Sequence, residues 1–358
     1  MINLGFWSHF AKASRDNKII CLAPLADVTD SAFRHIIAKH SKQITPHPKS
    51  QRAPLTFWDY VTFTEFVSAD GLVLAPEKGR NKLFKDLEYT EIERPIVAQL
   101  FGSRPENIRK AASLIVELGF DGLDINMGCP DKSIEKQGAG AALIKNPLLA
   151  RQLIKAAKQG ASRGALSKWG DESKTIPISV KTRLGYNSDE LEEWLPELLA
   201  EEPAVITIHA RTRKEMSKVP AHWDRVKRAV EIRDDMSRRV LDTKYKTLIF
   251  GNGDVWSVED AFVKAKESGA DGVMLGRAIF GNPFLFSSFV PKKEDKITAL
   301  KEHIILFDKN LGEVKSFAVM RKHFKSYLSG MEIDKNLKEQ LMKSNNIEEA
   351  LLILDKMI

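Results

Sequence analysis

Short apolar runs recur eight times along the first 280 residues of this chain, and helical spacing fills the segments between them. The runs lie at residues 19–27, 60–67, 94–102, 122–128, 176–184, 204–211, 247–254 and 272–280. Runs of this length that are rich in valine, isoleucine and threonine predict β-strands. The chain therefore alternates predicted strands with predicted helices.

The boundaries of the predicted helices carry their own signals. Pro105 stands near the start of one helical pattern, and Gly119 ends it. Ser257, with Asp260 three residues later, resembles a capping box in which aspartate replaces glutamate. Eight strand and helix alternations over about 260 residues match a (β/α)8 TIM barrel better than an open doubly wound sheet.

The strand pattern stops near residue 290, and residues 296–358 carry helical patterns only. We therefore place a boundary near 291 and expect an α/β barrel over 1–290, followed by an all-helical domain over 291–358. Two connections, 40–59 and 159–175, are longer than the rest and are punctuated by proline or glycine. Both predict surface insertions.

Composition narrows the class of protein. The 358 residues are 43% hydrophobic and 29% charged, which is enough to bury a substantial core. No apolar run approaches the roughly 20 residues of a membrane span, and the first residues lack the apolar segment of a signal peptide. Two cysteines are too few for a disulfide framework, and no CxxC or HxxxH spacing predicts a structural zinc site. We expect a cytoplasmic protein without membrane contact.

The formal net charge is +7, and much of the excess lies between residues 211 and 250. Twelve lysines and arginines stand there against six aspartates and glutamates. One interpretation is a solvated helix face, which charge alone favours. The sharper interpretation is a surface for a phosphate backbone.

Most of the candidate functional residues stand at the C-terminal ends of the predicted strands. In strand order they present Pro24, Leu25 and Ala26; Glu65; Gln99; Asn126 and Cys129; Lys181 and Arg183; His209 and Arg211; Asn252, Gly253 and Asp254; and Gly276 and Arg277. Packing gives no reason for polar residues to recur at one end of apolar strands. TIM barrels carry their active sites at this end, so we expect the site here.

Glycines at the last two strand ends favour a phosphate ligand. Gly253 lies in "GNGD" and Gly276 in "LGRA", where such barrels bind phosphate through backbone N–H groups, and Arg277 follows the second glycine. Glycine permits the close approach that this binding needs. We therefore favour a phosphate-bearing cofactor over two ordinary turns.

For three more strand-end residues, both a functional and a purely structural role are open. Lys181 alternates with apolar neighbours and would point inward to an anion, such as the N1 and O2 edge of a reduced flavin; a lysine that extends outward is commoner. Gln99 would bond the pyrimidine edge of a flavin or cap local backbone. His209, taken alone, is more often a core residue than a catalyst.

The two cysteines have different surroundings. Cys21 lies inside the first strand and is expected to be a small buried hydrophobe. Cys129 follows a strand end, and Pro130 prevents a helix there, so its thiol should be displayed in the barrel mouth. With an ordinary pKa of about 8.5, it is mostly protonated at pH 7 and could give a proton to a carbanion or enolate. A thiolate nucleophile is the alternative, but it usually needs an activating base or cation.

These motifs resemble, in the same order, those of the flavin-dependent tRNA-dihydrouridine synthases. The resemblance covers residues 19–290 nearly continuously and includes "APLADVTDSAFR", "RPIVAQLFGS", "VKTRLGY", "ITIHARTR" and "GNGDVWS". Its most specific part is "NMGCP" joined to "KQGAGAAL". The resemblance implies an FMN-bearing barrel and a helical tRNA-binding domain, which use NADPH to reduce particular uridines in tRNA to 5,6-dihydrouridine.

The resemblance also implies roles for single residues. Cys129 would protonate uracil C5 after hydride from flavin N5 reaches C6, and Asn126 would contact the base or the cofactor. The target uridine would leave its stack to reach the mouth. We expect a monomer and no bound metal. FMN would be held by Pro24, Leu25, Ala26, Gln99, Lys181, His209, Asn252, Gly253, Asp254, Gly276 and Arg277, and RNA would be contacted by Arg321, Lys322 and His323.

The chain departs from the family pattern at Asp27, Ala210 and Ser326 and in the two insertions. Two rival functions remain. One is a different FMN barrel that acts on a small pyrimidine such as dihydroorotate and would not need the helical domain. The other is a tRNA-binding chaperone without a working flavin, against which Cys129 and Lys181 argue.

Overall fold

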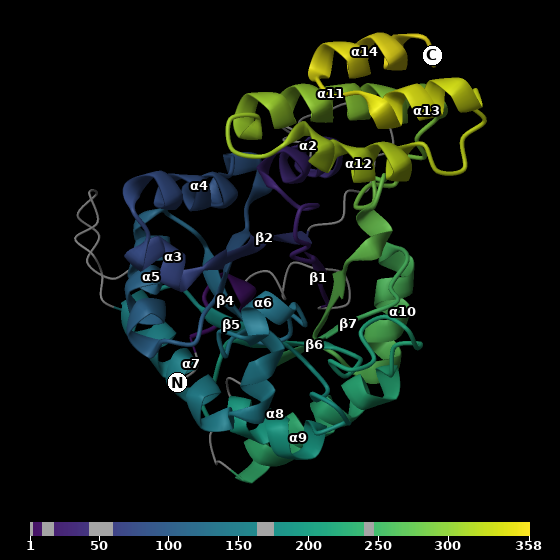
Figure 1. Ribbon diagram of the computed structural model, residues 1–358. Coiled ribbons are helices and arrows are strands. Elements are labelled where there is room, and N and C mark those ends of the chain that lie inside the picture. The colour runs from purple at the N-terminus through teal and green to yellow at the C-terminus, as the bar shows by residue number, and fades with distance from the viewer. Residues whose placement is uncertain (1–2, 9–17, 43–59, 163–174, 240–246) are drawn as a thin grey trace, which may run out of the picture.

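The computed structural model describes residues 3–8, 18–42, 60–162, 175–239 and 247–358. Within them, eight parallel strands form a closed barrel in the order β1 to β8 (Figure 1). Ile19–Leu22 of β1 pairs with Gly272–Leu275 of β8 and closes it. The predicted TIM barrel is therefore confirmed. The strands are β1 Ile19–Leu22, β2 Tyr60–Ser68, β3 Ile96–Phe101, β4 Gly122–Asn126, β5 Ile178–Arg183, β6 Val205–His209, β7 Leu248–Asn252 and β8 Gly272–Leu275.

Strands β1 and β8 are shorter than the apolar runs that predicted them. The first run continues to residue 27, but β1 ends at Leu22, and the carbonyl of Leu25 accepts hydrogen bonds from the amides of Val28 and Thr29. The last run continues to residue 280, but β8 ends at Leu275 and a 3-10 turn follows at Arg277–Ile279. The remaining residues of both runs thus form loops at the mouth of the barrel.

Helices alternate with the strands and surround the barrel. Pro105 is the first residue of α5, and Gly119 follows this helix with a φ of +81°, as their sequence signals predict. Ser257 accepts the amide of Asp260 at 3.1 Å, but the Asp260 carboxylate bonds the amide of Trp256, so the box is not reciprocal. The helices up to β8 are α2 Ser31–Ser41, α3 Ala69–Leu74, α4 Glu77–Leu87, α5 Pro105–Glu117, α6 Lys132–Glu135, α7 Pro147–Ser162, α8 Leu191–Leu199, α9 Trp223–Arg239 and α10 Val258–Ser268.

Apolar side chains fill the end of the barrel that lies opposite the mouth. Trp7 packs there with its ring 5.5 Å from that of Phe250 and 6.4 Å from that of Phe63. Cys21 belongs to the same cluster and is fully buried, as expected. Because this end is filled by hydrocarbon, the polar residues of the strands collect at the opposite end.

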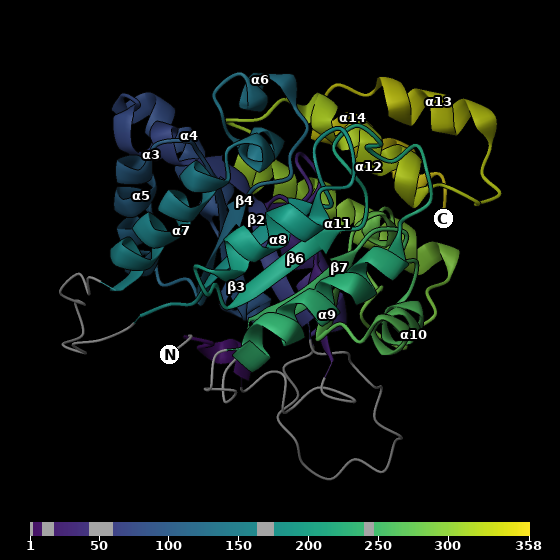
Figure 2. The same cartoon turned by 90° about the horizontal axis from the view of Figure 1, so that it is seen from below.

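The C-terminal segment is helical and packs against the barrel through α2. It contains α11 Lys293–Leu311, α12 Met320–Tyr327, α13 Lys335–Lys343 and α14 Ile347–Asp355. In Figure 1 these helices lie together above α2, and in Figure 2 α13 lies at the same end of the molecule as α6, which follows β4. Phe33 of α2 and Phe307 of α11 belong to one apolar cluster that spans both parts. The helical segment therefore flanks the barrel mouth.

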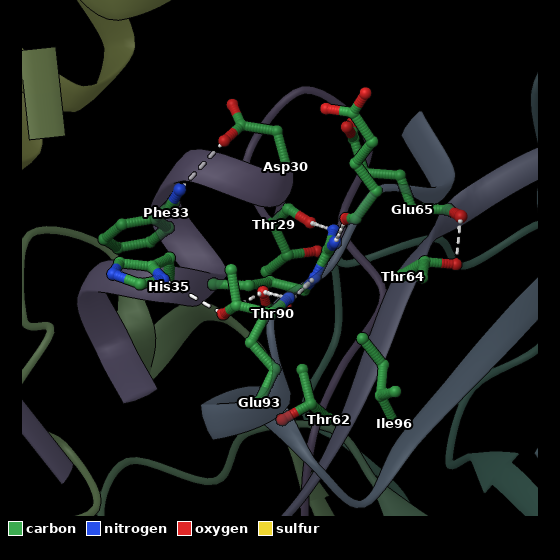
Figure 3. Close-up of polar contacts among 12 residues, drawn as sticks. Thr29, Asp30, Phe33, His35, Thr62, Thr64, Glu65, Thr90, Glu93 and Ile96 are labelled. Atoms are coloured by element: carbon green, nitrogen blue, oxygen red, sulfur yellow. Dashed lines mark hydrogen bonds and ion pairs between the residues drawn. The ribbon is translucent and has the colours of Figure 1, made fainter. Parts of the chain in front are cut away.

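A buried ion pair fixes α2 to the barrel. Arg34 Nε lies 2.8 Å from Glu93 Oε2, and both side chains are fully buried. The same guanidinium donates to the carbonyl oxygens of Thr29 and Glu88 at 2.8 and 2.6 Å. Figure 3 shows Thr29 and Glu93 on the two sides of this network. Removing one partner of such a buried pair would leave the other charge unpaired, which is strongly destabilising. The pair therefore holds α2 firmly in place as the base on which the C-terminal helices pack.

Residues 43–59 and 163–174, most of the two long connections, lie outside the described residues, and their surface position stays a prediction, while residues 159–162 form the end of α7. No helix in the described part of the chain has both the length and the apolar content of a membrane crossing.

Candidate active site

A cavity of about 290 Å³ opens at the C-terminal ends of the strands. All eight strands contribute to its wall, which is why residues far apart in the sequence meet there. All thirteen residues expected to act in catalysis, to hold the cofactor or to contact the base line it: Pro24, Leu25, Ala26, Gln99, Asn126, Cys129, Lys181, His209, Asn252, Gly253, Asp254, Gly276 and Arg277. The structure thus brings the expected catalytic and cofactor residues into one place.

Nine further residues line the cavity without an assigned role from the sequence, and four of them have large side chains. Arg183 ends β5 and Arg211 follows β6, so the signal that selected Lys181 was present for them too. Phe66 and Trp256 carry no polar signal, and only the fold places them there. Glu65 also stands at a strand end, but its carboxylate pairs with Lys315 at 2.7 Å and does not line the cavity.

Asn126 shapes the turn that displays Cys129. Its Oδ1 accepts the amides of Gly128 at 3.1 Å and Cys129 at 2.9 Å, so the chain leaves β4 in a tight turn. The Cys129 side chain is half-buried, and burial raises the pKa of its thiol. The thiol is therefore protonated at neutral pH, as a proton donor must be and a nucleophile must not.

Gly140 supports the same turn from the "KQGAGAAL" segment. The amide of Ala141 donates to the carbonyl oxygen of Cys129 at 2.9 Å. Gly140 has a φ of +61°, and a Cβ there would lie 2.7 Å from that carbonyl oxygen. The "KQGAGAAL" segment thus packs against the "NMGCP" turn, which explains why the two motifs occur together.

Replacing Gly140 by alanine is expected to destabilise the protein and displace Cys129. Gly330→Ala is the matched control, because Gly330 has a φ of +74° and nothing lies within 4 Å of its added Cβ. Both variants incur backbone strain, so the overpacking should lower the free energy of unfolding of Gly140→Ala by at least about 1 kcal/mol more. Urea unfolding measures the difference. Equal losses in the two variants would show that the contact with Cys129 has no energetic weight.

Gln99 lies in a buried network. Its Nε2 donates to Asp124 Oδ2 at 2.7 Å, and its Oε1 accepts from Asn126 Nδ2 at 3.0 Å. Ser179 Oγ donates to the other oxygen of Asp124 at 2.6 Å, while burial raises the pKa of Asp124 to about 6. These bonds fix the orientation of the Gln99 amide toward the cavity. Both partners are side chains, so these bonds do not make Gln99 a cap for local backbone.

Lys181, which is partly buried, and Arg183, which is buried, place two cations close together along β5. Lys181 Nζ donates to Asn252 Oδ1 at 3.2 Å, and burial, together with repulsion from Arg183, lowers the pKa of Lys181 to about 8. Arg183 donates to the carbonyl oxygen of Gly128 at 2.7 Å, and burial lowers its pKa to about 10. Since no carboxylate forms an ion pair with Lys181 among the described residues, the cavity offers a cation that an anionic ligand would stabilise.

His209 is held neutral beside the cations. Burial, followed by the charges of Arg183 and Lys181, places its pKa well below the ordinary value. Arg211 Nη1 lies 3.2 Å from His209 Nε2, and an arginine only donates, so Nε2 accepts and the ring proton is on Nδ1. His209 therefore offers the cavity no positive charge.

The glycine loops at β7 and β8 surround an ion-pair cluster. The Asp254 carboxylate bonds both Arg211 and Arg277, and the bond from Arg211 keeps the pKa of Asp254 below its usual range. Gly253 has a φ of +123°, a conformation that side chains rarely adopt. The Arg277 guanidinium is half-exposed and lies 5.2 Å from the centre of the Trp256 ring. One cation is thus held at the rim within reach of an entering ligand.

The chemistry of this lining fits FMN. Four cations, Lys181, Arg183, Arg211 and Arg277, surround the space, against the single carboxylate of Asp254 among the described lining residues. A phosphate and an anionic reduced ring are the charges that such a wall would bind.

The three residues assigned to RNA contact lie on α12, outside the cavity. Arg321 Nη2 donates to Asn345 Oδ1 at 3.2 Å, and exposed Lys322 lies 3.2 Å from Asp27 Oδ2 at the mouth. His323 is 3% exposed and packs against Phe33 and His303. The imidazole of His323 therefore faces the core and not the surface of α12, while RNA contact by Arg321 and Lys322 stays a prediction.

Comparison with known proteins agrees with this site. A family model described as dihydrouridine synthase (Dus) matches residues 21–358. A probable tRNA-dihydrouridine synthase of Staphylococcus aureus (strain COL) is 35% identical over 356 residues, covering 98% of this chain and 95% of that protein. Probable tRNA-dihydrouridine synthase 2 of Bacillus subtilis (strain 168) is 36% identical over 338 residues, with coverages of 93% and 92%.

Among solved structures, dihydroorotate dehydrogenase (DHODH) of Eimeria tenella in complex with ferulenol matches with a TM-score of 0.43 and 14% identity, over 82% of each chain. That likeness is too weak to bear on function. The family model and the full-length relatives are decisive, and they show that this chain belongs to the dihydrouridine synthase family.

Proposed function

We propose that the protein reduces particular uridines in tRNA to 5,6-dihydrouridine, with FMN in the barrel mouth and NADPH as the reductant. The observation that carries the proposal is Cys129, a protonated thiol displayed at the edge of a cavity whose wall is rich in buried cations. A family whose relatives are named for this reaction supports the same conclusion.

The cavity wall divides into two parts that suit the two ends of FMN. Arg277 and the loops around Gly253 and Gly276 would hold the phosphate, while Lys181 and Gln99 would bond the pyrimidine edge of the ring. Pro24 to Ala26 would form an apolar wall beside the ring. FMN, once reduced by NADPH, would supply the hydride that reaches uracil C6. The partly buried Lys181 would favour an anionic ring edge, because a desolvated cation is stabilised by a nearby negative charge.

Cys129 would complete the reduction by donating its proton to C5. As hydride adds to C6, the C5–C6 double bond opens and negative charge develops toward the C4 carbonyl. The thiol then gives its proton to C5 and becomes a thiolate, which the charges of Arg183 and Lys181 stabilise. Solvent returns the proton afterwards. The bonds from Asn126 hold the thiol in place throughout, and they leave Asn126 at the edge of the cavity, where a base would enter.

The outward face of α12 would contact the tRNA. Arg321 and Lys322 lie on it, while Met320, Phe324 and Tyr327 are buried beneath. Lys322 also reaches Asp27 at the mouth, so the proposed RNA surface continues to the cavity. A tRNA bound there would place an extruded uridine close to Cys129.

Arg321→Ala and Lys322→Ala are expected to weaken tRNA binding and to reduce its salt dependence. Each phosphate contact that is lost should make the slope of log K against log salt shallower by roughly 0.7 to 0.9. Titration of tRNA at several salt concentrations measures the slope. Lys338→Ala is a control, because that lysine donates to the carbonyl oxygen of Met331 elsewhere in the segment. An unaltered slope in both α12 variants would place the RNA on another surface.

The substrate class is tested with the flavin spectrum. Protein reduced by NADPH and freed of excess reductant should be reoxidised, without oxygen, by unmodified tRNA and not by orotate. Reoxidation by orotate with no response to tRNA would favour the small-pyrimidine rival. A colourless protein that takes up no FMN would favour an RNA-binding protein without redox chemistry.

A further inference from the structure

Three buried polar side chains meet where the helical segment packs on the barrel. Asp30 precedes α2, His303 lies on α11 and His323 on α12, and these elements lie side by side in Figure 1. All three residues are at most 3% exposed. One ligand atom from each lies within 4.8 Å of the others, the single group of this kind among the described residues. The cluster is separate from the cavity that contains Cys129.

Five polar atoms of the cluster and of neighbouring Tyr327 have no hydrogen-bond partner among the described residues. They are Asp30 Oδ2, both ring nitrogens of His303, Nε2 of His323 and the hydroxyl oxygen of Tyr327. In Figure 3, Asp30 Oδ1 accepts the amide of Phe33, at 2.9 Å, and no dashed line leaves the other oxygen. A buried polar atom without a partner destabilises the folded protein, so five of them in one place call for a ligand.

The donor set is that of a metal site. Two imidazole nitrogens and one carboxylate oxygen are ligands that zinc and similar ions prefer in proteins. Burial lowers the pKa values of His303 and His323, the latter to about 3, so both rings are neutral and keep a lone pair for an ion. Burial also raises the pKa of Asp30 to about 7, and a cation beside it would reverse that cost.

The neighbours of the cluster hold its rings without competing for their nitrogens. Phe33 stacks on His303 with ring centres 4.8 Å apart, and the rings of His303 and His323 meet edge to face at 4.5 Å. The charged groups that act on Asp30 are Glu65, Lys315 and Arg34, and Lys322 acts on His323. Lys315 pairs with Glu65, and Arg34 with Glu93, so each of these two cations has its own carboxylate.

We propose that Asp30, His303 and His323 bind one divalent transition-metal ion, for which zinc is the best fit. Bonds of about 2.1 Å would bring the ligand atoms to about 3.4 Å from one another in a tetrahedral site, so binding would draw the cluster slightly together. The Tyr327 ring lies 6.1 Å from that of His303, and its hydroxyl is suited to bond a water in the fourth position. Sequence spacing gives no sign of the site, because its ligands come from three separate elements.

The ion would fasten the helical segment to the barrel. It would join the start of α2, which Arg34 anchors, to α11 and α12. His323 follows Arg321 and Lys322 directly, so the ion would also fix the face of α12 relative to the mouth. This role is independent of the proposed reaction, and its test needs no enzyme activity.

The test is metal binding by the full-length protein, prepared without an affinity tag of histidines. Protein stripped with a chelator is titrated with Co²⁺, whose visible absorption reports tetrahedral nitrogen and oxygen ligands, and with Zn²⁺ while thermal unfolding is followed. We expect a 1:1 complex and a higher Tm with zinc. Asp30→Asn keeps the helix cap, because asparagine caps as well as aspartate, but loses the anionic ligand. It should weaken Co²⁺ binding roughly tenfold or more.

His303→Ala and His323→Ala should abolish the complex, and Asp30→Asn decides the matter if either histidine variant fails to fold. His35→Ala is the control, since His35 lies on α2 outside the cluster and contacts Thr90. Wild-type protein that takes up no cobalt, or Asp30→Asn protein that binds it as tightly as wild type, would overturn the site and leave buried water as the partner of these atoms.

Discussion

Cys129→Ala is expected to slow the reduction of uridine in tRNA by roughly 10²- to 10⁴-fold, the usual contribution of a positioned proton donor. FMN and tRNA binding should survive, because the turn at Cys129 is held by its backbone and by Asn126. Reduction of the flavin by NADPH should also survive, since that half-reaction needs no proton at uracil C5. Single-turnover transfer from reduced protein to unmodified tRNA measures the effect.

Two comparisons make this experiment specific. Cys21→Ala removes the other cysteine, which is buried in the barrel interior and should not affect transfer beyond a loss of stability. The pH profile of wild type adds a second readout. Because burial raises the pKa of Cys129, the active protonated form persists through neutral pH, and the rate should fall only in alkaline solution. Transfer at the wild-type rate by Cys129→Ala would refute the proton-donor role.

Lys181→Met is expected to weaken FMN binding by roughly 10- to 150-fold, the equivalent of one hydrogen bond to a charged group at about 1.5–3 kcal/mol. The substitution keeps an unbranched side chain that is one atom shorter and removes its charge. Protein without cofactor should lose little or no stability, because burial already disfavours the Lys181 cation, whose pKa is about 8. Equilibrium dialysis measures the affinity.

Lys264→Met is the matched control for charge, since Lys264 lies on α10 and pairs with Asp260. It should leave FMN binding unchanged. For wild type, FMN affinity should fall as pH rises above about 8, where Lys181 loses its proton in the protein without cofactor. Equal affinity of wild type and Lys181→Met, with no pH dependence, would show that Lys181 does not contact the cofactor.

The site could be located from the sequence because the fold places strand ends together. Alternating strands and helices predict the barrel, and a barrel brings Gln99, Cys129, Lys181 and Asn252 to one mouth whatever their separation in the chain. The resemblance then supplied roles for them. Arg183 and Arg211 had the same positional signal and no assigned role.

The burial of His323 was also predictable, from helical spacing. Met320, His323, Phe324 and Tyr327 stand at the i, i+3, i+4 and i+7 positions of α12, and all four are buried. The charge of the neighbouring Arg321 and Lys322 suggested a common role for all three residues. Periodicity separates them: the two cations lie on the other side of the helix from the histidine.

Other contacts could not be predicted, because they depend on how elements pack. The bonds that join Gln99 to Asp124 and Asp124 to Ser179 depend on the register of β3, β4 and β5. Lys315 pairs with Glu65 across 250 residues, where the helical segment meets the barrel. Neither partner carries a local signal for the other.

Reduction of uridine in tRNA by this chain can be observed directly in the product. Purified FMN-loaded protein is incubated with NADPH and unmodified tRNA, and the RNA is digested and mapped by mass spectrometry. We expect a gain of two hydrogens at particular uridines, absent without NADPH and strongly reduced with Cys129→Ala. A yellow protein that NADPH reduces, but that leaves every uridine unchanged, would contradict this expectation.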